Sequence, residues 1–90
     1  MDTDVLVDKA VLGKQVEIFF DSRVGKFLLA RIESEINRGV ELLKKVDPED
    51  VKQVRCLQNL VLRAESIESW FSEAIMDGIK ATEILEERDE

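Results

Sequence analysis

The strongest constraint in the sequence is the stretch from Pro48 to Arg88, in which Gly78 is the only residue after the proline that strongly disfavours a helix. A glycine inside a helix costs roughly 1 kcal/mol relative to alanine, too little to end so long a helix by itself. Within this stretch, the a and d positions of successive heptads carry no charge. They are Leu57, Leu60, Ala64, Ile67, Phe71, Ala74, Gly78, Ala81 and Leu85. Such a seam is typical of a helix packed lengthwise on another helix, so we predict one over residues 48–87.

The start of this long helix is marked by the only proline of the sequence, in Asp47-Pro48. An aspartate side chain accepts a backbone N–H at an N-cap, and proline suits the first helical position, where no N–H is needed. Lys44 and Lys45 stand just before, where cations favour the last turn of a preceding helix. We therefore predict that Asp47 caps the long helix and that a short connection folds two helices back on each other.

Two shorter helices are predicted upstream, over residues 4–20 and 22–46. The second begins at Ser22, a suitable N-cap, and carries an apolar stripe of helical period. The stripe is Val24, Phe27, Leu28, Ile32, Ile36, Val40, Leu43 and Val46. The fold class is thus all-α: an antiparallel helical hairpin in which the long C-terminal helix packs against two shorter helices.

The lengths of the helices suggest how they are arranged. At 1.5 Å per residue, the two shorter helices placed end to end match the long one, with a bend at Asp21 and Ser22. A second arrangement folds residues 4–20 back as a third member of a bundle. In the first arrangement, residues whose numbers sum to about 95 face each other. The expected pairs are Leu28 with Ile67, Val24 with Phe71, and Leu43 with Lys52.

Small residues in the second half of the seam let the backbone of a partner helix approach closely. They are Ala64, Ala74, Gly78 and Ala81. We expect a single all-helical domain over residues 1–90, with residues 1–3 and 86–90 frayed.

The residue inventory excludes several kinds of chemistry. The sequence has no histidine, no tyrosine and one cysteine, which removes imidazole-assisted nucleophiles, thiolate zinc sites and disulfide scaffolds. We predict no catalytic residue, no cofactor, no metal site and no enzymatic activity. Cys56, beside Leu57 and Leu60, is expected to be a small buried or half-buried filler.

The net charge of −7 is distributed unevenly, with −3 over residues 1–22, +3 over residues 23–63 and −7 over residues 64–90. An acidic chain is disfavoured on nucleic acid and on anionic membranes. The basic residues of the middle segment alternate with Glu33, Glu35 and Glu41, the pattern of ion pairs within helices. No apolar run approaches the roughly 20 residues that span a bilayer, and the start lacks the pattern of a signal peptide. We expect a cytoplasmic protein that binds neither membrane nor nucleic acid directly.

Apolar residues away from the seam indicate a second contact surface. Leu62, Met76 and Ile79 should be exposed in a lone hairpin, and Trp70 lies at the flank of the seam. Tryptophan and methionine are enriched in protein interfaces, so we predict these four residues as anchors for a homo-oligomer or a larger protein assembly. The alternative is scattered surface residues and a tryptophan that covers the seam.

An acidic face on the long helix supports another function. It comprises Glu65, Glu68, Glu73, Asp77 and Glu83. Such carboxylates can replace phosphates in an acidic inhibitor that mimics nucleic acid and binds a basic host or phage protein.

Four short motifs carry a resemblance over residues 16–80. They are Phe20-x-Ser22-x-x-Gly25-x-x-Leu28, Asp47-Pro48-x-Asp50, Leu57-Gln58-Asn59 and Trp70-x-x-Glu73-Ala74-Ile75-x-x-Gly78. In these motifs the sequence resembles small helical proteins of tailed phages and prophages. The resemblance implies a non-enzymatic part in the virion or its assembly, located in the host cytoplasm or the virion, and it implies no catalytic or ligand residues.

Overall fold

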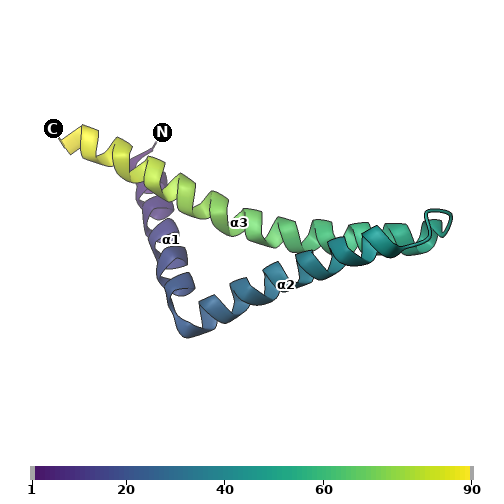
Figure 1. Ribbon diagram of the computed structural model, residues 1–90. Helices are drawn as coiled ribbons and strands as arrows, with labels where there is room; N and C mark the ends of the chain where they lie inside the picture. The colour runs from purple at the N-terminus through teal and green to yellow at the C-terminus, as the bar shows by residue number, and fades with distance from the viewer. Residues whose placement is uncertain (1, 90) are drawn as a thin grey trace. The chain divides into compact units, whose positions relative to one another are not determined.

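The computed structural model describes residues 2–89, which form three helices: α1 (Thr3–Asp21), α2 (Arg23–Lys45) and α3 (Val51–Asp89) (Figure 1). No residue in that range lies in a strand. The long helix α3 packs against both shorter helices, which confirms the all-α prediction. The described residues at both ends of the chain are helical or cap a helix, whereas Met1 and Glu90, also predicted to fray, lie outside the described residues.

Contacts divide the chain into two compact units. The terminal unit combines Met1–Lys26 with Trp70–Glu90, and it holds α1 and the later part of α3. The hairpin unit is Phe27–Ser69, and it holds most of α2 and the first part of α3. The terminal unit therefore joins segments that are far apart in the sequence, whereas the hairpin unit joins neighbours through a short connection.

The connection between α2 and α3 corrects the predicted helix start. The carboxylate of Asp47 accepts the backbone N–H of Glu49 at 3.0 Å, within a tight turn that precedes the helix. The carboxylate of Asp50 accepts the N–H of Gln53 at 3.2 Å, which is the geometry of an N-cap. The prediction of Asp47 as the cap and Pro48 as the first helical residue is therefore wrong. Asp47 closes the turn, and Asp50 caps α3, which begins at the next residue.

Replacing the two aspartates separately tests this assignment. Asp50→Ala should lower the free energy of unfolding by about 1 kcal/mol, the usual cost of losing an N-cap, and Asp50→Asn should retain most of it. Asp47→Ala should lower the free energy of unfolding by less, because the Asp47 carboxylate accepts an N–H within the turn and not one at the start of the helix. Urea denaturation followed by circular dichroism measures both. A larger loss for Asp47→Ala than for Asp50→Ala would contradict the assignment.

Within the hairpin unit, α2 and α3 enclose a small apolar core and lie side by side (Figure 1). Its buried hydrophobic residues are Ile32, Leu57, Val61 and Ala64. A Cβ built at Gly39 would lie 2.5 Å from Cγ2 of Val61 and 3.0 Å from Cδ2 of Leu60. The expected register would place Gly39 opposite Cys56, so the observed contact is displaced by about one helical turn along α3. The displacement shows that the five-residue connection does not pair the helix ends symmetrically.

The apolar stripe of α2 is buried only in part. Ile32 is buried and Leu28 is half-buried, but Val24 is 66% exposed and Phe27 is 71% exposed. At 3.6 residues per turn, Val24 and Phe27 point about 80° and 140° away from Ile32 around the helix. The predicted inward position of these two residues is therefore wrong. Phe71, expected to meet Val24, instead packs edge-to-face on Phe20, with ring centroids 4.8 Å apart.

In the terminal unit, α1 and α3 touch through their backbones. A Cβ built at Gly13 would lie 2.8 Å from Cα of Gly78 and 2.8 Å from the carbonyl oxygen of Ala74. A Cβ built at Gly78 would lie 2.9 Å from the carbonyl oxygen of Lys9. The close approach predicted for the second half of the seam is thus confirmed at Ala74 and Gly78. No side chain fits between the helices at this crossing.

Contacts on both sides of the crossing give the direction of α1 on α3. Near the start of α1, the hydroxyl of Thr3 accepts a hydrogen bond from Nη1 of Arg88 at 3.1 Å. Near its end, Phe20 packs on Phe71. Early residues of α1 therefore meet late residues of α3, and the two helices run in opposite senses, as predicted.

Gly78→Ala should test the backbone contact. In an exposed helix this change stabilises by roughly 1 kcal/mol. Here we expect a net loss of at least about 1 kcal/mol, because the added methyl group meets backbone atoms that cannot rotate away. Adding Gly13→Ala should then cost less than the two single losses combined, since both methyl groups force apart the same pair of helices. Denaturation with urea measures the free energies, and strictly additive losses would argue against a shared contact.

The corner between α1 and α2 depends on Ser22 and Gly25. The Ser22 hydroxyl donates to the carbonyl of Phe19 and accepts the backbone N–H of Gly25 at 3.1 Å, so Ser22 caps α2 as predicted. A Cβ at Gly25 would overlap the carbonyl oxygen of Phe19 and lie 2.7 Å from Cα of Phe20. The resulting bend at Ser22 allows α2 to begin one residue after the end of α1.

Gly25→Ala should be more damaging than the same change at Gly39. At Gly25 the methyl group meets fixed backbone, and we expect a loss of about 2 kcal/mol or more. At Gly39 it meets the ends of the Leu60 and Val61 side chains, which can move, and the gain in helix propensity offsets part of the cost. Thermal and urea denaturation of both variants provide the comparison. Equal stability changes would contradict the close contact at the corner.

Candidate interaction surfaces

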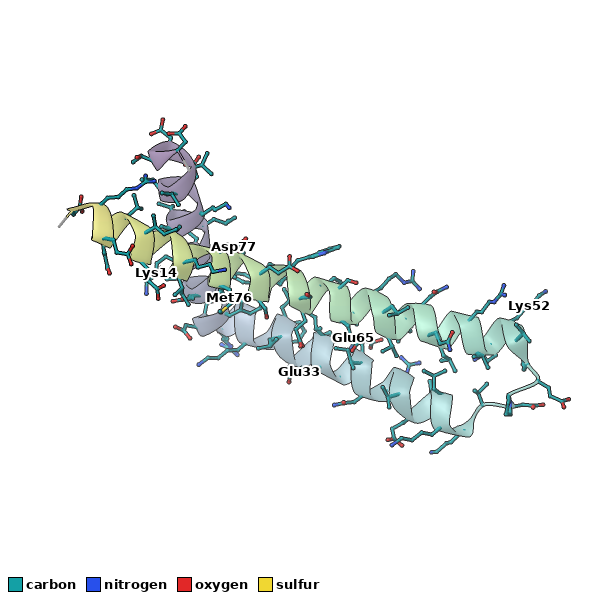
Figure 2. The ribbon with its side chains drawn as sticks, turned by 90° about the horizontal axis from the view of Figure 1, so that it is seen from above. Lys14, Glu33, Lys52, Glu65, Met76 and Asp77 are labelled. Carbon is teal, nitrogen blue, oxygen red and sulfur yellow. The ribbon has the colours of Figure 1, made fainter. Side chains whose placement is uncertain are left out.

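The four predicted anchors are exposed and belong to two different units. Leu62, in the hairpin unit, is 59% exposed. Trp70, Met76 and Ile79 lie in the terminal unit, and all three are exposed. Met76 and Asp77 leave α3 in different directions (Figure 2). The expected exposure is therefore present, with one anchor in the hairpin unit and three in the terminal unit.

A larger set of exposed apolar residues lies on α1, and the sequence-based prediction of anchors missed it. The set, called here the α1 apolar surface, is Val5, Val7, Val11, Leu12, Ile18 and Phe19. By contrast, only Leu6 and Gly13 of α1 are buried. The signal in the sequence was the presence of apolar residues on all sides of α1, since a helix packed on one neighbour buries only one side.

An open groove lies between α1 and α3 in the terminal unit, with a volume of about 250 Å³. We call it the terminal groove. Its lining residues are Ala10, Gly13, Lys14, Glu17, Ile75, Gly78, Ile79, Thr82 and Glu83. The Lys14 ammonium and the Glu17 carboxylate form an ion pair at 3.5 Å, and the hydroxyl of Thr82 donates to the carbonyl of Gly78 at 2.9 Å. These polar groups therefore lie beside apolar surface of the groove, which stays accessible because Gly13 and Gly78 carry no side chains to cover it.

The hairpin unit has a groove of its own, of about 310 Å³, next to one predicted anchor. It is lined by Leu43, Gln58, Val61 and Leu62. Three of the four side chains are apolar, and none carries a charge. Leu62 itself is 59% exposed, so part of its apolar surface is accessible to a partner.

The predicted acidic face is distributed over both units. Glu65 and Glu68 belong to the hairpin unit, and Glu68 is half-buried. Glu73, Asp77 and Glu83 belong to the terminal unit and are exposed. Within the terminal unit, helical geometry places Asp77 about 120° around α3 from Glu83. The five carboxylates therefore do not form a single row.

The charge of the two units differs. Twelve acidic and six basic residues give the terminal unit a net charge of −6, whereas eight acidic and seven basic residues give the hairpin unit −1. In the hairpin unit, Glu35 pairs with Arg31 at 3.2 Å and with Arg38 at 3.9 Å, as the alternating pattern predicted. Such exposed pairs contribute about 0–1 kcal/mol each, so they balance charge more than they stabilise.

Between Asp2 and Asp89 there is no group of three His, Cys, Asp or Glu side chains placed to hold a metal ion. None of the helices in this range combines the length and the apolar character that crossing a membrane requires. Cys56 is exposed, so its prediction as a buried or half-buried filler is wrong. It lies next to the buried Leu57, and one residue turns a side chain about 100° around the helix.

Comparison with known proteins gives no relative to report: no family model, no curated protein and no solved structure matches the chain.

Proposed function

We propose that this chain is a non-enzymatic structural or interaction protein, a helical hairpin that associates with further copies of itself or docks on a larger protein assembly. The observation that carries the proposal is the α1 apolar surface. Ile18 is 60% exposed and Leu12 is 53% exposed, on a helix whose only buried large side chain is Leu6. A surface of this kind is typical of helices that are buried on more than one side in their working state.

Energetic arguments support association rather than a free monomer. Apolar surface removed from water contributes about 25 cal/mol per Å². A standard interface buries about 800 Å² on each partner. The α1 apolar surface offers six large exposed apolar side chains, distributed over more than one side of α1, to interfaces of this kind. The non-enzymatic part of the proposal relies on the residue inventory, which lacks histidine and tyrosine.

The setting in a phage virion or its assembly is a narrower proposal. It is supported by the resemblance of residues 16–80 to small helical proteins of tailed phages and prophages. A non-enzymatic component of such an assembly needs surfaces that contact its neighbours. The α1 apolar surface is a candidate for such a contact.

Sedimentation velocity on the purified chain at micromolar concentration, alone and mixed with candidate partners, tests the association. We expect a species larger than the monomer. The double variant Val11→Ser with Ile18→Ser should shift it toward the monomer, because it removes two exposed apolar side chains from α1. Val51→Ser is a matched control, since Val51 is 57% exposed but lies in the hairpin unit. A monomer that binds nothing, or equal effects of the variants, would contradict the proposal.

The same measurement separates the rival function, an acidic inhibitor that mimics nucleic acid. Neutralising Glu65, Glu68, Glu73, Asp77 and Glu83 together to the corresponding amides should abolish the binding of such an inhibitor. An association carried by the α1 apolar surface should persist, because those five carboxylates lie on α3 and not on α1.

A further inference from the structure

We propose that the terminal groove is a docking site for a basic amphipathic helix of a partner protein. The proposal rests on the proposed function and deepens it, because it names the site at which the chain docks and the chemistry of the partner.

The shape of the terminal groove favours a helix over a small molecule. Pockets for small molecules measure about 300–1,000 Å³ and enclose most of the ligand, whereas this groove measures about 250 Å³ and is open. Two helices form its walls, and a third helix packs well in the groove between two others. Gly13, Gly78 and Ala10 have little or no side chain, so the bottom of the groove stays unfilled. Side chains from successive turns of a docked helix can therefore reach it.

The walls of the groove determine which face of that helix enters. Ile75 is half-buried and Ile79 is 43% exposed, so both have apolar surface that a ligand can cover. Met76 is exposed beside them on the same helix. A partner that buries these side chains must present an apolar stripe, which is the usual way in which an amphipathic helix binds a groove.

The charges around the groove determine which charge the partner helix must carry beside its apolar stripe. Glu83 lines the α3 side and forms no ion pair in the described residues. On the α1 side, Lys14 and Glu17 pair with each other, so their charges balance and Glu83 is the charge that a partner meets. The net charge of −6 on the terminal unit adds a longer-range preference for cations.

The same charge decides among other occupants. Within the groove, the terminal unit of a second copy, which also carries −6, matches the charge less well than a basic helix does, as do anionic lipids and nucleic acids. Association of copies through the α1 apolar surface does not require the groove. A helix with an apolar stripe flanked by Lys or Arg matches both the apolar walls of the groove and the negative charge around it. The occupant is therefore a segment of a different, basic protein.

Selection from a displayed library of short amphipathic helices, with flanking positions randomised among Lys, Glu and Gln, tests the proposal on the full chain. We expect enrichment of helices with Lys flanks. Synthetic peptides of the selected sequences should bind in titration calorimetry, at least about tenfold more tightly than the same peptides with Glu flanks, and more weakly as salt increases. Enrichment of Glu flanks, or no enrichment of any helix, would overturn the proposal.

Four variants locate the binding. Ile79→Ser and Glu83→Lys change the groove and should each weaken the selected peptides by about fivefold or more. Asp77→Lys is the matched control for Glu83→Lys, because it makes the same change of charge on the same helix but outside the groove. It should have a smaller effect at physiological salt, where charges are screened within about 8 Å. Equal losses for the two lysine variants would overturn the groove as the site.

The fourth variant, Val11→Ser with Ile18→Ser, separates this proposal from the proposed function. Circular dichroism first confirms that each variant keeps its helix content. If the selected peptides lose affinity only for the α1 double variant, the chain docks through the α1 apolar surface, and the terminal groove is not the site. If self-association is lost in that variant while peptide binding is retained, the two surfaces act separately, and the groove proposal holds.

Discussion

The backbone contact between Gly13 and Gly78 is the interaction on which the terminal unit depends. α1 buries one large side chain, Leu6, so side-chain packing alone contributes little to the stability of its contact with α3. Two helices that approach at glycines gain many short-range dispersion contacts between backbone atoms. The Phe20–Phe71 pair and the Thr3–Arg88 hydrogen bond support the same arrangement on either side. α1 therefore lies directly against one helix, and most of its own surface is left in solvent.

Much of this arrangement follows from sequence periodicity, and the departures have physical causes. The heptad seam predicted α3, and Gly78 marked a close approach without revealing that Gly13 would meet it. Asp47 and Asp50 both suit a cap, and only the fold of the turn decides between them. Periodicity gives the face of a helix but not its offset along a neighbour, which is why the register in the hairpin unit differs by a turn. Cys56 and Phe27 belong to the same class of error, since each lies a large fraction of a turn from the buried face.

The candidate surfaces were less predictable than the fold. Leu62, Met76 and Ile79 were recognisable because they lie away from the heptad seam, and Trp70 because it lies at the flank of the seam. The α1 apolar surface required knowing how few neighbours α1 has, which no local pattern states. The groove formed by Gly13 and Gly78 depends on a pair of residues from distant parts of the chain, so no single stretch of sequence contains it.

The two units combine charge and apolar surface in different ways. In the terminal unit, a net charge of −6 accompanies the exposed apolar residues, so like charge weakens the association of two such surfaces at low salt and screening by salt restores it. In the hairpin unit, opposite charges alternate along α2 and largely cancel. A strongly charged apolar surface associates selectively, because a partner must match both properties.

The division of the terminal unit between two distant segments has a consequence for the order in which the chain folds during translation. α1 leaves the ribosome first, but the part of α3 that it packs against, from Trp70 onward, emerges only after the whole of Phe27–Ser69. The hairpin unit has local contacts and can form while synthesis continues. Until Gly78 is available, the nascent α1 lacks the backbone contact that holds it on α3, and its apolar side chains stay in water for that time.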